Sequence, residues 1–334
     1  MADNNTTGRF IGRSFRLVER SLSTDDDAAA TLREFAAQGI HYVIADLDAA
    51  PLLAAADAVR ATPVLLFNSR APDDELRAAQ CRANVLHTIP SRAMLADALA
   101  QYLAWKRWSE WLLVIGPAAG DQQLAHAYRR AAKRFGATIV EEKRWTFKAG
   151  HGRADTGHVV LQTELPVLTR GRDHDVLVVA DETEQFGPWL EGRTARARPV
   201  AGTHALVTTG WSPVAEQWGS SQLQSRFRRQ AGRWMNARDY AAWLAARSVG
   251  EAVIRSNSAD PAAVGAYLRG PQFQLAGFKG RAHSFREWDG QMRQPVLIAG
   301  SRLLVSVSPQ PGFLHRRTEL DTLGVDKEES ECRF

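Results

Sequence analysis

The sequence predicts an α/β protein built from two consecutive sheet layers, and three observations support this prediction. Several short runs are apolar throughout, among them PVLLFN at 63–68 and DVLVVA at 175–180. These runs alternate with helical segments, which is typical of parallel sheets covered by helices on both faces. The chain has 334 residues, 45% of them hydrophobic, which is enough for two domains of this kind.

The stretch 81–116 is expected to join the two layers. The apolar run 84–88 is a predicted strand that ends before Pro90, because proline disfavours helix in the residue before it. Ser91 is the predicted cap of a helix whose leucines recur at three- to four-residue spacing. The next strand, 112–115, begins the second layer.

The remaining elements follow from the same periodicities. In the first layer we predict strands 15–19, 41–47 and 63–68 and helices 28–37 and 51–60. In the second we predict strands 138–142, 175–180 and 199–202 and helices 122–135, 158–168 and 184–190. The chain then continues with helices 214–227, 237–254 and 261–268, a hairpin region at 271–300 that turns at Asp289-Gly290, and a last strand at 303–308.

The composition indicates which kinds of partner the protein can bind and in which cellular compartment it is expected. The formal net charge is +5, but the basic residues are scattered, and the densest group, Arg226 to Arg233, is interpreted as the outer face of a helix. We therefore predict no nucleic-acid partner. No apolar run has the length of a membrane span, and polar residues follow Met1 where a signal peptide would be apolar, which by itself indicates the cytosol. Cys81 and Cys332 could form a disulfide in an oxidising compartment or be two buried thiols.

Enzyme motifs are absent from the sequence. It has no GxSxG, P-loop, HExxH, paired CxxC or GxGxxG pattern, and its nine histidines show no metal-ligand spacing. We therefore predict a binding protein rather than an enzyme, without a cofactor.

Candidate ligand-binding residues follow the predicted strands. In open parallel sheets, ligands bind beyond the carboxyl ends of the strands. This rule selects Asp46, Asp48, Asn68, Ser69, Ala71 and Thr88 in the first layer, and Asp181, Glu182, Thr183, Glu184, Thr203 and His204 in the second. If the acidic members converged, their oxygens would suit a hard cation. Those members are Asp46, Asp48, Asp181, Glu182 and Glu184. The alternative is that they cap helices.

Longer segments carry a family resemblance. The stretch PVLLFNSRAPDDELR and the strand, turn and helix after it resemble type I periplasmic binding proteins of the branched-chain amino-acid receptor kind. Four segments are similar to one subfamily, the ABC-transporter substrate-binding proteins encoded beside PQQ-dependent alcohol dehydrogenase systems, some of which accompany lanthanide-utilisation genes. These segments are DNNTTGRFIG, RDYAAWLAARSVGEA, FKGRAHSFREWDGQMRQPVLI and SVSPQPGFLHRRTELDTLGVDKEESEC.

The resemblance implies two Rossmann-like lobes that close over a ligand by a hinge. Lobe 1 would comprise 1–107 and 230–285, and lobe 2 would comprise 108–229 and 286–306, with the tail 307–334 packing back on lobe 1. Family members have a signal peptide, a strand and a helix ahead of DNNTTG. We therefore expect a truncated start, a periplasmic native protein and an open position in the first sheet. The resemblance also implies a disulfide between Cys81 and Cys332.

The function implied is capture of a small ligand in the cleft between the lobes and its delivery to a permease and ATPase. The ligand would be a lanthanide ion, PQQ or an alcohol-related metabolite, and the only membrane association would be through the permease. The NSRA and ADETE segments match the amino-acid receptor patterns only loosely, which disfavours an ordinary amino-acid ligand. The alternative function is a periplasmic sensor or accessory protein that docks a dehydrogenase or a signalling partner without transport.

Overall fold

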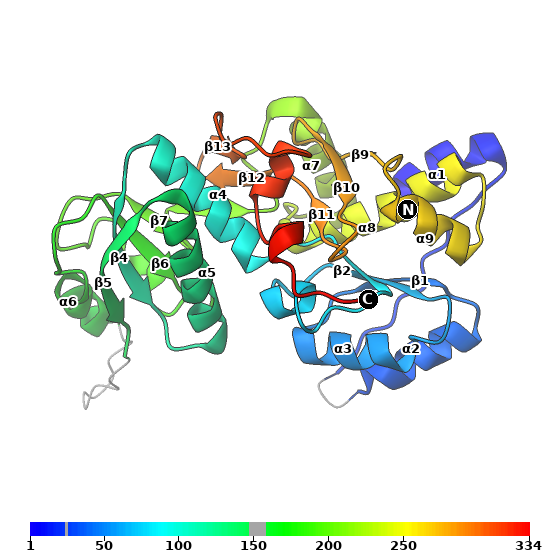
Figure 1. The fold of residues 1–334 in the computed structure, drawn as a ribbon, viewed down its shortest axis with the longest axis horizontal. Coiled ribbons are helices and arrows are strands. Elements are labelled where there is room, and N and C mark those ends of the chain that lie inside the picture. The colour runs from blue at the N-terminus through cyan, green and yellow to red at the C-terminus, as the bar shows by residue number, and fades with distance from the viewer. Residues whose placement is uncertain (24–25, 147–157) are drawn as a thin grey trace. The chain divides into compact units, whose positions relative to one another are not determined.

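A computed structural model describes residues 1–23, 26–146 and 158–334 (Figure 1). The chain divides into two compact units, each of which is described by itself. Unit 1 comprises Met1–Ser91, Glu216–Pro295 and Asp326–Phe334, and unit 2 comprises Arg92–Ala215 and Val296–Val325. Among the described residues, no helix combines the length and the apolar character that crossing a bilayer requires.

Unit 1 contains a parallel sheet in the order β1-β2-β3, formed by Tyr42–Ala45, Leu65–Asn68 and Val85–His87. Helices α2 (Ala28–Ala37) and α3 (Ala49–Ala58) cover one face, as Figure 1 shows. Helix α8 (Ala237–Ser256) contacts β1 and β2. Strand β2 is buried along its whole length, which explains why its first three residues, Leu65 to Phe67, are apolar without alternation.

The remainder of unit 1 consists of short elements. Helix α9 has Asp260 as its N-cap and proline at its first position, as the sequence predicts. Strand β10 pairs in antiparallel fashion with β9 and β11, and Gly290, in the turn before β11, has φ +68°, a conformation that favours glycine. The bounds are α1 (Ala2–Gly8), η1 (Arg9–Ile11), η2 (Asp74–Arg77), η4 (Gln217–Gly219), α7 (Ser220–Ala231), α9 (Pro261–Arg269), β9 (Leu275–Ala276), β10 (Ala282–Phe285), β11 (Met292–Arg293) and η6 (Lys327–Glu329).

Unit 2 contains a seven-stranded sheet in the order β13-β12-β8-β7-β6-β4-β5. Strands β5, β4, β6, β7 and β8, in this order across the sheet, are parallel to one another. Strand β12 is antiparallel to both of its neighbours, β8 and β13. Apolar residues of α4, α5, β4 and β6 form one continuous core. The bounds are α4 (Arg92–Trp105), β4 (Glu110–Ile115), α5 (Ala119–Phe135), β5 (Thr138–Arg144), α6 (His158–Leu168), β6 (Val176–Ala180), η3 (Gly187–Trp189), β7 (Val200–Gly202), β8 (Leu206–Thr209), β12 (Val296–Ala299), β13 (Leu304–Ser308) and η5 (Glu319–Thr322).

A buried carboxylate ties three segments of unit 2 together. Asp97, on α4, is fully buried and accepts hydrogen bonds from Arg130 and Arg134 of α5 at 3.0–3.1 Å. It also accepts one from the Gly324 N–H at 2.8 Å. The same two arginines donate to the Gly324 carbonyl at 2.9 and 2.7 Å. The chain after β13 is therefore fixed to unit 2 at Gly324.

The units divide the chain differently from the expected lobes. Helix α4 belongs to unit 2 rather than lobe 1, because it packs against α5 and against β12 and β13. The segment 286–295 belongs to unit 1 rather than lobe 2, because β11 pairs with β10, and 216–229 also lies in unit 1. Of the tail 307–334, only Asp326–Phe334 lies in unit 1.

Most predicted elements are confirmed, and three predictions are wrong. The strand predicted at 15–19 is extended but belongs to no sheet of the described chain. The helix predicted at 184–190 is only the 3₁₀ turn η3, and the helix predicted at 214–227 begins at Ser220. Strand β8 was not predicted.

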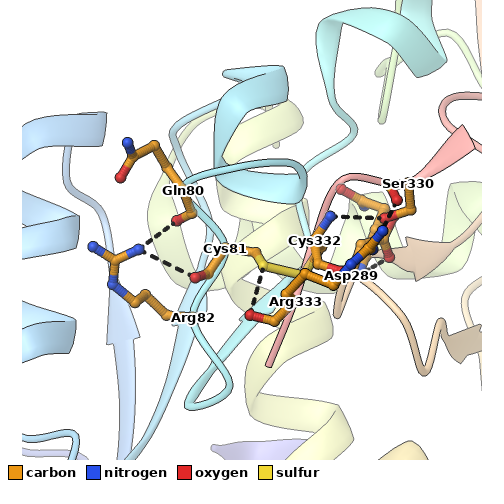
Figure 2. Close-up of a disulfide and its surroundings, with 8 residues drawn as sticks. Gln80, Cys81, Arg82, Asp289, Ser330, Cys332 and Arg333 are labelled. Carbon is orange, nitrogen blue, oxygen red and sulfur yellow. Dashed lines mark hydrogen bonds between the residues drawn. A yellow bond between two sulfur atoms is a disulfide. The ribbon is translucent and has the colours of Figure 1, made fainter.

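The predicted disulfide between Cys81 and Cys332 is confirmed (Figure 2). Their Cα atoms are 5.6 Å apart, and the cysteines are separated by 251 positions in sequence. On one side of the bond, Arg82 donates to the carbonyl oxygens of Gln80 and Cys81. On the other, the Cys332 N–H donates to Ser330 Oγ at 3.2 Å. The last residues of the chain are thus held covalently to unit 1.

Candidate ligand-binding site

Asp181, in unit 2, acts as a cap for the turn that follows it. It directly follows strand β6, which ends at Ala180, and it is fully buried. Its carboxylate accepts hydrogen bonds from the N–H groups of Gln185, Phe186 and Gly187 at 3.0, 2.9 and 2.7 Å. Three backbone donors gathered on one carboxylate explain why the segment turns here instead of continuing as the helix predicted at 184–190. Three of the acceptor positions of the Asp181 carboxylate are therefore used within unit 2.

Glu182, in unit 2, is neutralised by an ion pair. Arg92, nearly buried at the start of α4, donates to its two carboxylate oxygens at 2.9 and 2.7 Å. A third donation from Arg92 goes to Gln123 Oε1 at 2.7 Å. The Glu182 N–H also donates to Asp121 Oδ1 at 2.6 Å. A bidentate pair of this kind is both strong and geometrically specific, so Glu182 is held in place. Arg92 was missed from the sequence, although it directly follows the predicted cap Ser91.

The remaining predicted residues of unit 2 surround Asp181. Thr203 Oγ1 accepts the Asp181 N–H at 3.1 Å and lies 2.9 Å from His204 Nδ1. The His204 ring packs on Gly187, where a Cβ would lie 2.0 Å from Nδ1, so that position requires glycine. Burial lowers the pKa of His204 below its ordinary value. Thr183 and Glu184 lie in an exposed turn.

In unit 1, the predicted ligand-binding residues that are buried form hydrogen bonds with one another or with the backbone. Asn68 Oδ1 accepts the N–H groups of Arg70 and Ala71, and its Nδ2 donates to the Ala71 carbonyl and contacts His87 Nδ1 at 3.0 Å. Thr88 Oγ1 donates to the Asn68 carbonyl at 3.1 Å. Ser69 Oγ donates to the Ala45 carbonyl at 3.2 Å, and Ala71 is buried. These residues shape the ends of β2 and β3.

His87 completes this buried group and was not among the predicted residues. Burial, with a further effect of the nearby Arg77, lowers its pKa well below the ordinary histidine value. His87 is therefore neutral in the folded protein, and its Nδ1 can accept the hydrogen bond from Asn68.

Three charged side chains at the strand ends of unit 1 remain partly or largely exposed. Asp46 follows β1 directly and is exposed. Arg70 Nε lies 2.8 Å from Asp48 Oδ1, and these side chains are 32% and 73% exposed. The Arg70 Nε–H makes no hydrogen bond of good geometry within the described chain. These three side chains, Asp46, Asp48 and Arg70, are called the strand-end charges below. Arg70 was missed, although it stands within the quoted NSRA segment.

The five acidic residues of the cation hypothesis are divided between the two units. Asp46 and Asp48 belong to unit 1, whereas Asp181, Glu182 and Glu184 belong to unit 2. Within the part of the chain that the structure describes, no group of three or more His, Cys, Asp or Glu residues is placed to hold a metal ion.

Comparisons with known proteins agree on the fold. A model of the periplasmic binding protein family matches residues 1–164. A binding protein for leucine, isoleucine, valine, threonine and alanine from Brucella ovis, in its closed conformation, has a TM-score of 0.74 at 14% identity, covering 99% of this chain and 91% of that one. A branched-chain amino-acid ABC transporter periplasmic ligand-binding protein from Burkholderia xenovorans has a TM-score of 0.72 at 18% identity, covering 92% and 87%.

An ABC-transporter solute-binding protein from Rhodopseudomonas palustris, in complex with benzoate, has a TM-score of 0.66 at 12% identity, covering 98% of this chain and 91% of that one. A search of curated proteins finds no match. The chain therefore has the fold of type I periplasmic binding proteins, and its first 164 residues match the periplasmic binding protein family.

Proposed function

We propose that this chain is the solute-binding component of an ABC transporter, located in the periplasm, which captures a small ligand and delivers it to a permease and ATPase. The observation that carries the proposal is the likeness of 99% of the chain to a protein named for the amino acids it binds. The benzoate-bound protein, of the same fold, adds support from a second ligand class. The disulfide favours an oxidising compartment, because such bonds are rare in reducing ones.

We further propose that the ligand is a small organic anion that bears a carboxylate, with Arg70 as its anchor. The fixed fork of a guanidinium matches a carboxylate in two parallel hydrogen bonds. In unit 2, by contrast, the carboxylates of Asp181 and Glu182 already have partners. Of the ligands that the sequence suggests, a lanthanide ion, PQQ or an alcohol-related metabolite, PQQ fits best, because it carries carboxylates. The link to PQQ-dependent alcohol oxidation is part of this proposal.

Titration calorimetry with PQQ, benzoate, lanthanum and small alcohols tests the ligand class. We expect heat with a carboxylate ligand, and a 10- to 100-fold weaker affinity in Arg70→Gln, because hydrogen bonds to charged groups contribute about 1.5–3 kcal/mol. Asp48→Asn should leave that affinity unchanged or raise it, because the competing carboxylate is gone. The control is Arg33→Gln, which removes another exposed arginine of unit 1.

A cation ligand would give the reverse pattern. Lanthanum would then produce heat, Asp46→Asn and Asp48→Asn would weaken its binding, and Arg70→Gln would strengthen it by removing a like charge. That outcome would overturn the anion proposal but would leave the solute-binding function intact. No heat with any small molecule, together with no permease or ATPase on purification from the native membrane, would count against the transport function itself.

A further inference from the structure

Unit 1 contains a hollow of about 1310 Å³ at the end of its parallel sheet where β2 and β3 begin. Residues 61–65 and 81–84, which lead into these two strands, form part of its lining, and residues of α3 and α9 and the segment 333–334 complete it. The candidate ligand-binding residues of unit 1 lie at or beyond the carboxyl ends of the strands, at the opposite end of the sheet. The hollow is therefore separate from the candidate site.

Positive charge is in excess among the residues that line this hollow. They include four arginines and one acidic side chain, which leaves three positive charges over. Like charges gathered in one place repel one another, so such a group is unfavourable unless an anion balances it. The hollow is called the arginine hollow below, and its charged lining residues are Asp57, Arg60, Arg82, Arg269 and Arg333.

Within the described chain, Arg82 is the arginine of the hollow that has a counter-ion. It donates to the two carboxylate oxygens of Asp57 at 2.6 and 3.0 Å. Its Nη1 donates to the carbonyl oxygens of Gln80 and Cys81 at 3.0 and 3.1 Å (Figure 2). Every nitrogen of this guanidinium is thus in use, and no acidic lining side chain is left for the other three arginines.

Arg269, at the end of α9, carries its charge in partly buried surroundings without a carboxylate partner. Its Nη2 donates to the Ala83 carbonyl oxygen, and its Nε and Nη1 have no hydrogen-bond partner among the described residues. Burial lowers the pKa of this guanidinium below the ordinary arginine value. Because arginine nevertheless stays protonated in proteins, the charge is present, and an anion beside it would be stabilising.

Arg60 and Arg333 also lack a direct carboxylate partner. Arg60, just after α3, is exposed and makes no direct ion pair or hydrogen bond within the described residues. Arg333 is placed by the disulfide, because it follows Cys332 and its carbonyl oxygen lies 4.0 Å from Cys81 Sγ (Figure 2). Its Nη1 donates to two backbone carbonyl oxygens of its own segment, which leaves its Nε and Nη2 without partners in the described chain.

We propose that the arginine hollow binds a small, soluble anion that carries two linked phosphoryl groups, through Arg60, Arg269 and Arg333. The planar fork of a guanidinium matches phosphate oxygens in two parallel hydrogen bonds, and linked phosphoryl groups offer several such oxygens and several charges. Arg269 and Arg333 are both held at the segment 81–83, which brings two of the forks to one place. Because Arg269 is partly buried, the anion must be small enough to enter the hollow. The proposal is independent of the ligand at the candidate site.

Titration calorimetry with pyrophosphate, on the oxidised full chain at physiological ionic strength, tests this proposal. We expect heat, and an affinity at least about tenfold weaker in each of Arg60→Gln, Arg269→Gln and Arg333→Gln, because each variant removes charge-assisted hydrogen bonds. Asp57→Asn should instead raise the affinity, since it removes the acidic side chain of the hollow and releases the two nitrogens of Arg82 that bind it.

Two control variants test the location. Arg238→Gln removes an exposed arginine of unit 1 that lies outside the hollow and makes no ion pair within the described chain, so it reproduces the loss of charge alone. Arg70→Gln removes the proposed anchor of the candidate site. Neither should change the affinity for pyrophosphate by more than about twofold, since salt screens distant exposed charges. Far-ultraviolet circular dichroism checks that all variants fold.

Several results would overturn the proposal. No heat with pyrophosphate at either of two temperatures, or equal affinities in Arg269→Gln and Arg238→Gln, would show that the hollow does not bind it. A loss of affinity confined to Arg70→Gln would place the anion at the strand-end charges. Citrate that bound as tightly as pyrophosphate would exclude a requirement for phosphoryl groups. Vesicles of phosphatidic acid that bound the protein when pyrophosphate did not would identify a membrane surface as the partner.

Discussion

The two sheets differ in completeness, although the same sequence pattern predicts both. In the described residues, the sheet of unit 2 has seven strands, and the carboxylates of Asp181 and Glu182 at its strand ends are bonded within the unit. The described parallel sheet of unit 1 has three strands, in which β1 pairs only with β2, and its strand-end charges are exposed. Groups that a fold leaves unused are available to bind something else. The described carboxylates at the strand ends of unit 2 thus have more partners within their unit than the strand-end charges of unit 1 have within theirs.

The largest expected effect comes from removing the buried charge of unit 2. Asp97→Asn should lower the free energy of unfolding of unit 2 by about 3 kcal/mol, because it leaves Arg130 and Arg134 without their carboxylate partner. Hydrogen exchange measured separately for peptides of each unit checks this value, since one global transition is not expected for two units.

A matched control lies in unit 1. Arg82 donates to Asp57 in the same two-pronged way, at 2.6 and 3.0 Å, but the Asp57 side chain is 45% exposed. Asp57→Asn should therefore cost less than about 1 kcal/mol. Equal losses in the two variants would mean that burial does not distinguish these ion pairs.

The next effect concerns the disulfide of unit 1. The double variant Cys81→Ser/Cys332→Ser should lose about 2–4 kcal/mol of stability, because the unfolded chain regains the entropy of an open loop. Urea denaturation of the variant checks this loss, and reductant should reproduce it in the wild type. If reductant also lowered the stability of the double variant, which has no disulfide, the effect of the reductant would have another origin.

A smaller effect on the free energy of unfolding should appear when the pH is lowered, and it should originate in unit 1. The unfolded chain takes up a proton at His87 near pH 6.5, whereas burial prevents the folded protein from doing so. Unfolding is thus favoured as pH falls below 6.5, by about 1.4 kcal/mol between pH 8 and pH 5.5. The loss of stability over that range should be smaller by this amount in His87→Asn. An unchanged pH dependence would mean that His87 is protonated in the folded protein.

The smallest effect is expected in the extended segment 15–19 of unit 1. Leu17→Thr should change the stability of residues 1–334 by less than about 0.5 kcal/mol, because the side chain is 52% exposed. Thermal unfolding checks this value. A loss above 1 kcal/mol would indicate that Leu17 is covered in solution.

The sequence predicted the elements whose signals are local. Helix α2 has the predicted bounds, and its N-cap, Asp27, is the last of the three aspartates before it. Strand β6 and residues 65–67 of β2 are apolar without a break, which marks them as buried on both faces. The disulfide was predicted through the family resemblance, because composition alone left a disulfide and two buried thiols equally open.

The predictions that failed depended on contacts distant in sequence. The segment 184–190 begins with the helix formers Glu184 and Gln185, but Gly187 and Pro188 disfavour helix, and Asp181 binds the N–H groups of residues 185–187. Arg92 and Glu182 lie 90 positions apart, so no local pattern could join them. The same holds for the buried group around His87, which depends on how β2 and β3 pair.

The disulfide has a further consequence for the integrity of the chain. All of unit 2 lies in sequence between Cys81 and Cys332, so the S–S bond closes a covalent ring that contains it. A single proteolytic cut inside that ring leaves one molecule of unchanged size under non-reducing electrophoresis, and two fragments after reduction. The protein can thus be nicked once in a loop of unit 2 without separating the two units.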